Sequence, residues 1–135
     1  MNSKINIIIV DDNKVFLEGV SSFLKDDPKF NIIAQFTSGI ELINYPHLAL
    51  ADIVLLDIEM PEMNGIETAK IVNQKCRHIK LIAVTMYQDK VYLRQLVEAG
   101  FRTFVNKVNV TETILEAIET TLAGKYNFPS DLKLN

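Results

Sequence analysis

Short aliphatic segments alternate along this chain with segments whose apolar residues recur at helical spacing. The first, residues 5–10, reads Ile-Asn-Ile-Ile-Ile-Val, and the third, residues 52–56, ends in Ile-Val-Leu-Leu. Such continuous apolar segments indicate strands buried on both faces, which is typical of parallel sheets covered by helices. We expect strands at 5–10, 30–36, 52–56, 81–84 and 101–106, and helices at about 16–27, 38–45, 66–75, 89–99 and 110–123.

This alternation of strand and helix predicts an α/β fold, a (βα)5 doubly wound parallel five-stranded sheet with right-handed crossovers. Sheets of this kind bind ligands beyond the carboxyl ends of their strands, where the strand order reverses. The polar residues at the predicted carboxyl ends are Asp11, Asp12, Asp57, Thr85 and Lys107. The sequence therefore predicts one functional site at one edge of the sheet.

Composition narrows the function classes. A chain of 135 residues, 48% of them hydrophobic, is expected to form a single domain. The net charge of −3 and the scattered basic residues argue against nucleic-acid binding by this segment. The single cysteine, Cys76, excludes an internal disulfide and is typical of a reducing cytosol. Because we recognise neither a secretory signal nor a membrane-spanning apolar stretch, we expect a cytoplasmic protein.

Carboxylates that gather at buried strand ends repel one another and favour a bound cation. Mg²⁺ or Mn²⁺ suits such a site, because these ions prefer carboxylate, carbonyl and water oxygens. We expect Asp12 and Asp57 to bind the ion directly, Asp11 to bind it through water, and the backbone carbonyl of Glu59 to supply a further ligand. Asp12 could alternatively serve as a cap of the first helix.

Asp57, at the end of the central strand, is the candidate nucleophile, since a carboxylate can attack a phosphoryl group and form an aspartyl phosphate. Lys107 would place a positive charge near the transferred oxygens, and Thr85 would offer a hydroxyl donor. Phosphoryl transfer depends mainly on such positioning and charge stabilisation. At the start of the last helix, Asn109 and Glu112 are spaced as a capping box.

The residues of the predicted site occur in a familiar pattern. Residues 55–65 read Leu-Leu-Asp-Ile-Glu-Met-Pro-Glu-Met-Asn-Gly and follow the Asp11-Asp12 pair. With Thr85 and Lys107, they resemble the receiver domain of two-component response regulators over residues 5–124. The resemblance implies a flavodoxin-like receiver fold with strand order 2-1-3-4-5, in which residues 1–124 form the domain. It also implies that Asp57 is the phosphoacceptor and a sensor histidine kinase the donor.

The same resemblance implies a switch. Thr85 would turn towards the phosphoryl group, and Phe104, three residues before the lysine, would move with it. The surface of the fourth helix, fifth strand and fifth helix would then change and contact an output domain or a second copy. Glu59 and Tyr87 are at positions that resemble tuners of phosphate lifetime. Such a domain is a signalling module that promotes its own phosphorylation and dephosphorylation, not a conventional enzyme.

Finer features resemble the NarL/LuxR-type subfamily, whose output is a helix-turn-helix DNA-binding domain. Ala99-Gly100-Phe101 is similar to its fifth-strand region, and Val108 replaces the proline that follows the lysine in many receivers. Residues 124–130 resemble the start of its linker. We therefore expect residues 125–135 to begin a linker to a missing DNA-binding output domain.

Three alternatives share parts of this pattern. A stand-alone receiver in a phosphorelay would use every residue of the predicted site. An aspartate-nucleophile phosphohydrolase of the haloacid-dehalogenase type needs an acidic residue two positions after the nucleophile, where Glu59 lies. A degenerate receiver would act only as an interaction module, which the complete residue set disfavours.

Overall fold

The expected strands form one parallel sheet in the order β2-β1-β3-β4-β5 in a computed structural model that describes residues 4–129. This order confirms the predicted doubly wound sheet. It reverses at β1, since β2 lies on one side of β1 while the later strands follow on the other. The strands are β1 (Ile5–Val10), β2 (Phe30–Phe36), β3 (Ile53–Asp57), β4 (Lys80–Thr85) and β5 (Phe101–Asn106).

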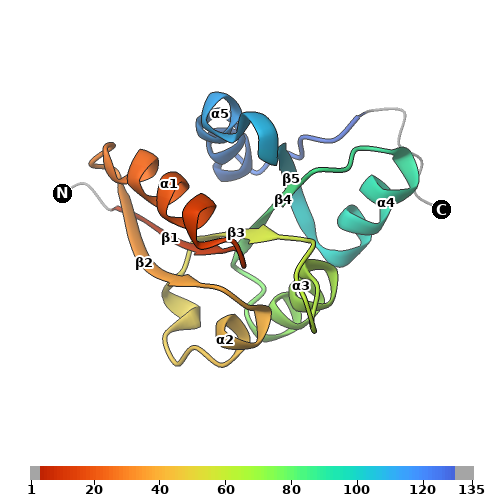
Figure 1. Cartoon of the computed structure of the whole chain (residues 1–135), viewed down its shortest axis with the longest axis horizontal. Coiled ribbons are helices and arrows are strands. Elements are labelled where there is room, and N and C mark those ends of the chain that lie inside the picture. Colours follow the sequence, from red (N-terminus) through yellow and green to blue (C-terminus); the bar gives the residue numbers. More distant parts are fainter. Residues whose placement is uncertain (1–3, 130–135) are drawn as a thin grey trace.

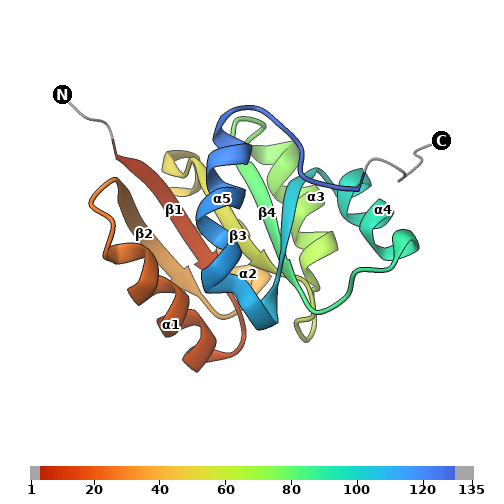
Figure 2. The ribbon, with the colours of Figure 1, turned by 90° about the horizontal axis from the view of Figure 1, so that it is seen from above.

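Helices cover both faces of the sheet. Figures 1 and 2 show α1 and α5 together on one face and α2, α3 and α4 on the other. The helices are α1 (Lys14–Lys25), α2 (Gly39–Ile43), α3 (Gly65–Lys75), α4 (Lys90–Ala99) and α5 (Val110–Leu122). Two short 3-10 helices, η1 (Leu48–Leu50) and η2 (Lys107–Asn109), were not expected from the sequence.

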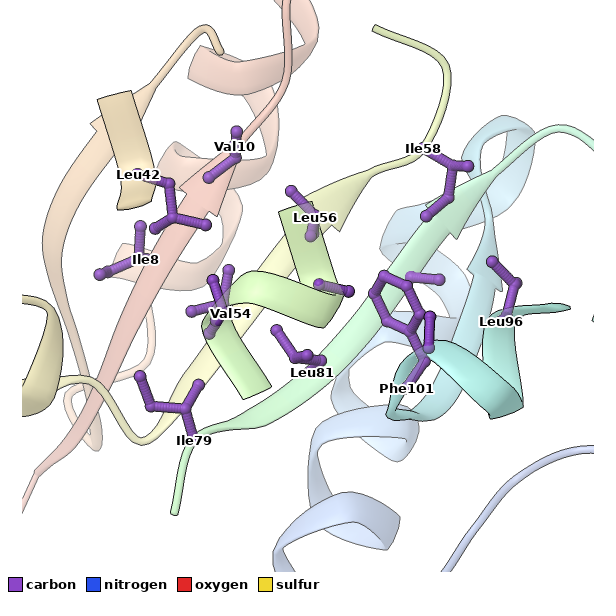
Figure 3. Close-up of a cluster of buried hydrophobic side chains, with 14 of the residues drawn as sticks. Ile8, Val10, Leu42, Val54, Leu56, Ile58, Ile79, Leu81, Leu96 and Phe101 are labelled. Carbon is purple, nitrogen blue, oxygen red and sulfur yellow. The ribbon is translucent and has the colours of Figure 1, made fainter. Parts of the chain in front are cut away.

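The central strand β3 contributes to a hydrophobic cluster on each face of the sheet. Val54 and Leu56 pack on the side of α2, α3 and α4, as Figure 3 shows, whereas Ile53 and Leu55 pack on the side of α1 and α5. All four side chains are at most 1% exposed. Burial on both faces explains why the strand sequence is continuously aliphatic. It also holds the end of β3, and therefore Asp57, in a fixed position.

Side-chain caps set where two helices begin. Asn13, and not Asp12, caps α1: its side-chain oxygen accepts a hydrogen bond of 3.1 Å from the Phe16 main-chain N–H. Asp12 is thereby left free of a capping role. Asn64 and Glu67 form a capping box at α3, with bonds of 2.9 and 3.2 Å. This box, which we did not predict, orders the loop that follows Asp57.

The capping box predicted for α5 is wrong. Asn109 precedes α5, but its side chain makes no capping bond. The physical reason is η2, because this 3-10 turn runs directly into α5 and leaves Asn109 outside the extended conformation of a cap. Instead Asn106 accepts a bond of 2.9 Å from the Val108 N–H and caps η2. The peptide bond before Val108 is trans, as expected without proline.

Glycine is required at Gly65, where the loop after β3 returns to the strand. Its N–H donates to the Ile58 carbonyl at 2.9 Å. A Cβ atom at this position would lie 2.4 Å from the Asp57 carbonyl oxygen and 2.7 Å from the Ile58 Cα. Both neighbours are backbone atoms that cannot rotate away, so a larger residue would displace the strand end that carries Asp57.

The segment that follows α5 lies along the outer edge of β5. Asn127 pairs in parallel with Thr103, and its N–H donates to the Arg102 carbonyl at 3.1 Å. The Phe128 ring lies 5.3 Å from the Phe104 ring, centroid to centroid. Figure 2 shows this segment turning towards α4 after it leaves α5. The chain therefore remains in contact with the domain for several residues past its last helix.

The predicted linker begins within this contacting segment, and its residues 130–135 lie outside the described part of the chain. Across residues 4–129, none of the helices has the length and apolar character needed to cross a membrane.

Candidate functional site

The residues predicted for the site converge at one edge of the sheet. Asp11 directly follows β1 and is followed by Asp12, Asp57 is the last residue of β3, and Thr85 is the last residue of β4. Lys107 directly follows β5 and begins η2. Because the strands are parallel, their carboxyl ends meet, and the order β1-β3-β4-β5 places Asp57 between Asp11 and Thr85.

The Asp57 carboxyl group is buried, and few favourable interactions offset the free-energy cost of its burial. It is 1% exposed, and within the described residues neither of its carboxylate oxygens has a hydrogen-bond partner. The nearest opposite charge is the Lys107 Nζ, 3.6 Å from Oδ2. Burial and then the negative charge of Asp11 raise the pKa of Asp57 to about 8, against the opposing charge of Lys107. An additional positive charge would therefore be favourable beside Asp57.

Lys107 is held by two carboxylates and an aromatic ring. Its Nζ lies 2.9 Å from Asp11 Oδ2 and 3.6 Å from Asp57 Oδ2. The same Nζ lies 4.8 Å from the centroid of the Phe16 ring, within the range of a cation–π interaction. Desolvation alone would lower the pKa of Lys107, but the hydrogen bond to Asp11 and the charge of Asp57 outweigh it and the pKa is raised. The ammonium is therefore protonated and fixed beside Asp57.

The predicted metal ligands lie together. Asp11, Asp12 and Asp57 each bring a carboxylate oxygen within 4.8 Å of the others. Asp11 and Asp57 are buried whereas Asp12 is exposed, so the cluster opens to solvent on one side. The Glu59 carbonyl accepts no backbone hydrogen bond from residues 4–129. The acidic pocket could hold a divalent cation, because the unpartnered oxygens of Asp57 match a hard cation's preference for oxygen.

Thr85 lies on the other side of Asp57 and its hydroxyl faces a different set of partners. Thr85 is 0% exposed, and its Oγ1 donates to the Tyr92 Oη at 3.1 Å. The Glu59 Oε2 lies 3.4 Å from the same hydroxyl and accepts a short hydrogen bond from the Tyr92 hydroxyl. The Tyr87 main-chain N–H donates to Thr85 Oγ1 at 3.1 Å. Thus Glu59 and Tyr87 both contact Thr85.

Phe104 is half-buried on β5, where it is in register with Ala83 of β4. Its ring packs against the cluster on the side of α4 and against Phe128 of the segment after α5. Phe104 is therefore close to the end of β4, where a movement of Thr85 would alter the space available to its ring. The contact with Phe128 was not foreseen.

Sequence reasoning missed Tyr92 and Phe16 as parts of the site, because both were assigned only to apolar helix faces. A signal for Tyr92 was present, since a tyrosine within a buried helical stripe needs a partner for its hydroxyl. Burial, and then its hydrogen bond to Glu59, raise the pKa of Tyr92 above its usual range. Phe16 follows the Asn13 cap by three residues, which brings its ring to Lys107.

Comparison with known proteins gives a consistent result. Residues 7–119 match the response regulator receiver domain family. The chain is 30% identical over 128 residues to the transcriptional regulatory protein LnrK of Bacillus subtilis, covering 95% of this chain and 58% of LnrK. It is 27% identical over 122 residues to the transcriptional regulatory protein DegU of Brevibacillus brevis, covering 90% and 52%. The chain thus spans little more than half the length of these relatives.

Solved structures have the same fold. A LuxR-family response regulator from Aurantimonas sp. SI85-9A1 is 26% identical with a TM-score of 0.86, covering 96% of this chain and 93% of that one. The isolated receiver domain of RcsB from Salmonella enterica serovar Typhimurium, solved with the phosphomimetic BeF3⁻, is 24% identical with a TM-score of 0.83, covering 96% of each. With the family match extending over most of its length, the chain belongs to the response regulator receiver domain family and is of the NarL/LuxR type.

Proposed function

We propose that Asp57 of this receiver domain accepts a phosphoryl group from a phosphohistidine of a sensor histidine kinase. One observation carries the assignment to this residue. Asp57 is the buried carboxylate at the end of the central strand, its oxygens have no hydrogen-bond partner within residues 4–129, and the Lys107 Nζ lies 3.6 Å away. These oxygens are free to bind a cation, and the positive charge of that cation would favour the ionised carboxylate that attacks phosphorus.

The proposed step is an in-line displacement. A carboxylate oxygen of Asp57 forms a bond to phosphorus while the bond from phosphorus to the histidine nitrogen breaks, and the imidazole leaves with the electron pair and then takes up a proton. Lys107 stabilises negative charge on the transferred oxygens, since its ammonium already lies beside Asp57. Thr85 donates its hydroxyl to a phosphoryl oxygen after leaving its present partners.

Asp11, Asp12 and Asp57, with the carbonyl of Glu59, would hold Mg²⁺ or Mn²⁺ in this proposal. The bound cation would supply positive charge between two anionic reactants. Support for it comes from the closeness of the carboxylates, which lie within 4.8 Å of one another, and from the exposure of Asp12. Because Lys107 alone faces two buried carboxylates, the pocket retains excess negative charge that such a cation would neutralise.

The proposed output is a change on the surface of α4, β5 and α5. Movement of Thr85 towards the phosphoryl group would free space that Phe104 enters, which shifts the population between two surface conformations. We propose that this surface contacts a DNA-binding output domain or a second copy. LnrK and DegU are transcriptional regulatory proteins, and RcsB dimers have been solved bound to DNA. A protein that receives its phosphoryl group from such a kinase and acts on DNA would work in the cytoplasm. Residues 125–135 would begin the linker to the output domain.

The phosphohydrolase alternative is not supported. A hydrolase of that type needs the carboxyl group two residues after the nucleophile to protonate the leaving group. Here the Glu59 carboxylate accepts a hydrogen bond from the Tyr92 hydroxyl and lies 3.4 Å from the Thr85 hydroxyl, so it is already engaged by two side chains of the domain. The family match is also to receiver domains.

The test is intact mass spectrometry after incubation with acetyl phosphate and Mg²⁺. We expect one added phosphoryl group on the wild-type protein and none on Asp57→Asn, which removes the nucleophile with little change of volume. Asp26→Asn is the matched control, because Asp26 is an exposed aspartate beyond the end of α1. EDTA should prevent the modification.

Modification of Asp57→Asn to the wild-type extent would show that another residue is the acceptor. Modification that persists in EDTA would contradict the cation in the acidic pocket while leaving Asp57 as the acceptor.

A further inference from the structure

Three side chains beside Asp57 form a hydrogen-bonded chain with a defined direction. The Thr85 hydroxyl donates to the Tyr92 Oη at 3.1 Å, and the Tyr92 hydroxyl donates to the Glu59 carboxylate. The carboxylate can only accept, so it fixes the direction of donation along the chain. Each hydroxyl has a single hydrogen, and in this arrangement the two hydrogens bind Tyr92 and Glu59, while the Asp57 oxygens accept no hydrogen bond from residues 4–129.

This chain links three elements of the fold. Thr85 ends β4, Glu59 follows β3, and Tyr92 lies in the first turn of α4. The start of α4 is held in place because the Asp89 side chain accepts from the Tyr92 N–H at 2.9 Å. The Tyr92 ring also packs against the buried cluster on this face and against Tyr87, with ring centroids 5.6 Å apart. Tyr92 is therefore a fixed acceptor, and Thr85 has to leave it in order to act elsewhere.

A phosphoryl group on Asp57 competes with Tyr92 for the same hydrogen. The Thr85 hydroxyl cannot donate strongly to both, because it has one hydrogen. The Tyr87 N–H can keep its bond to Thr85 Oγ1, since an oxygen that donates still accepts. The phosphoryl group thus competes with the two acceptors that the Thr85 hydroxyl now has. Tyr92 Oη is the nearer at 3.1 Å, and Glu59 Oε2 lies at 3.4 Å.

We infer that Tyr92 is a positioning residue, which holds the Thr85 hydroxyl away from Asp57 in the unphosphorylated protein and so opposes the phosphorylated state. This inference rests on the proposed role of Asp57. It adds to that role a specific residue of α4 that loses a partner when Thr85 engages the phosphoryl group. Phosphorylation of Asp57 would thereby change a contact at the start of α4 through Thr85 and Tyr92, without involving Phe104.

The experiment is a double-mutant cycle on the affinity for beryllofluoride, the phosphomimetic BeF3⁻ present in the RcsB receiver structure. The proteins are wild type, Tyr92→Phe, Thr85→Val and the double variant, titrated in excess Mg²⁺ and followed by amide NMR signals. Removal of the Tyr92 hydroxyl should tighten beryllofluoride binding by about two- to tenfold, the range of one neutral hydrogen bond. In the Thr85→Val background the same substitution should have no effect, because no threonine hydroxyl remains to be released.

Tyr45→Phe is the matched control, since Tyr45 is also half-buried but packs against Phe36 on the face of α2. It should bind beryllofluoride as the wild type does. Unchanged or weaker binding by Tyr92→Phe would overturn the role of Tyr92, and so would an equal change in the Thr85→Val background. Absence of both phosphorylation and beryllofluoride binding in the wild type would instead overturn the proposed function, and the inference with it.

Discussion

The two sides of Asp57 differ in the kind of interaction that holds them. On one side Asp11 and Lys107 form an ion pair of 2.9 Å, in which the Asp11 side chain is 1% exposed and the Lys107 side chain 19% exposed. On the other side Thr85 and Tyr92 are joined by a neutral hydrogen bond of 3.1 Å. Loss of a partner from a buried ion pair destabilises a protein by about 3–5 kcal/mol, whereas a neutral hydrogen bond contributes about 1 kcal/mol.

This difference suits two separate tasks. The charged side remains in one arrangement, because separation of the pair would leave the buried Asp11 carboxylate without its positive partner. It can therefore supply fixed electrostatic stabilisation during phosphoryl transfer. The hydroxyl side can exchange partners for a small change in free energy, which is what a switch requires. Asp57 thus lies between a fixed ion pair, formed by Asp11 and Lys107, and a hydrogen bond between Thr85 and Tyr92 that can exchange partners.

Replacement of Lys107 by methionine tests the charged side and should have the largest effect. Loss of the ammonium removes stabilisation of the transferred oxygens, so we expect the phosphorylation rate with acetyl phosphate to fall by about 100-fold. The rate is measured by intact mass at saturating Mg²⁺, with thermal unfolding as a check of folding. Lys70→Met is the control, since Lys70 is exposed on α3. A decrease of less than threefold would mean that Lys107 has no part in transfer.

The pH dependence of stability tests the same side with a smaller effect. The pKa of Asp57 is about 8 in the folded protein and 3.8 when unperturbed, so the folded state retains a proton that the unfolded state releases between these values. The stabilisation from this group is complete below about pH 4 and is lost as the pH rises towards 8. In EDTA, the free energy of unfolding should fall by about 2 kcal/mol more between pH 5.5 and 7 in wild type than in Asp57→Asn, since a difference of one bound proton contributes about 1.4 kcal/mol per pH unit. Parallel pH profiles for the two proteins would exclude a raised pKa at Asp57.

The charged side could be predicted from sequence because buried parallel strands are recognisable and their carboxyl ends meet. Asp11, Asp57 and Lys107 lie at the carboxyl ends of three such strands, so their convergence depends only on the strand order. Errors of one or two residues in the helix boundaries did not affect it, because strand ends and not helix starts position these groups.

The hydroxyl side could not be predicted in the same way. Helical periodicity assigns Tyr92 to a buried face of α4, but it does not say which polar group its hydroxyl meets. That contact depends on how the start of α4 packs against the loop after β3, a tertiary arrangement with no local pattern. The failed capping box at Asn109 has a similar origin, since a 3-10 turn after Lys107 changes the backbone there.

The contact between Phe104 and Phe128 provides the weakest test, at the outer edge of the hydroxyl side. The Phe128 ring is half-buried and lies 5.3 Å from the Phe104 ring, without a charge or a polar partner. Phe128→Ala should lower the free energy of unfolding by about 1 kcal/mol, which is typical of an aromatic pair at a partly exposed site. The Asn127 amide, which donates to the Arg102 carbonyl, should exchange its hydrogen faster.

The control for this change lies two residues earlier in the same segment. The Tyr126 ring is 60% exposed and contacts Arg102 at 5.2 Å, so Tyr126→Ala should have a smaller effect on unfolding than Phe128→Ala. Equal effects of the two substitutions would mean that the segment is held by its backbone pairing with β5 and not by the ring of Phe128. In that case phosphorylation could move Phe104 without loosening the segment that follows α5. The structural change that begins at Thr85 would then extend to β5 but not to Phe128.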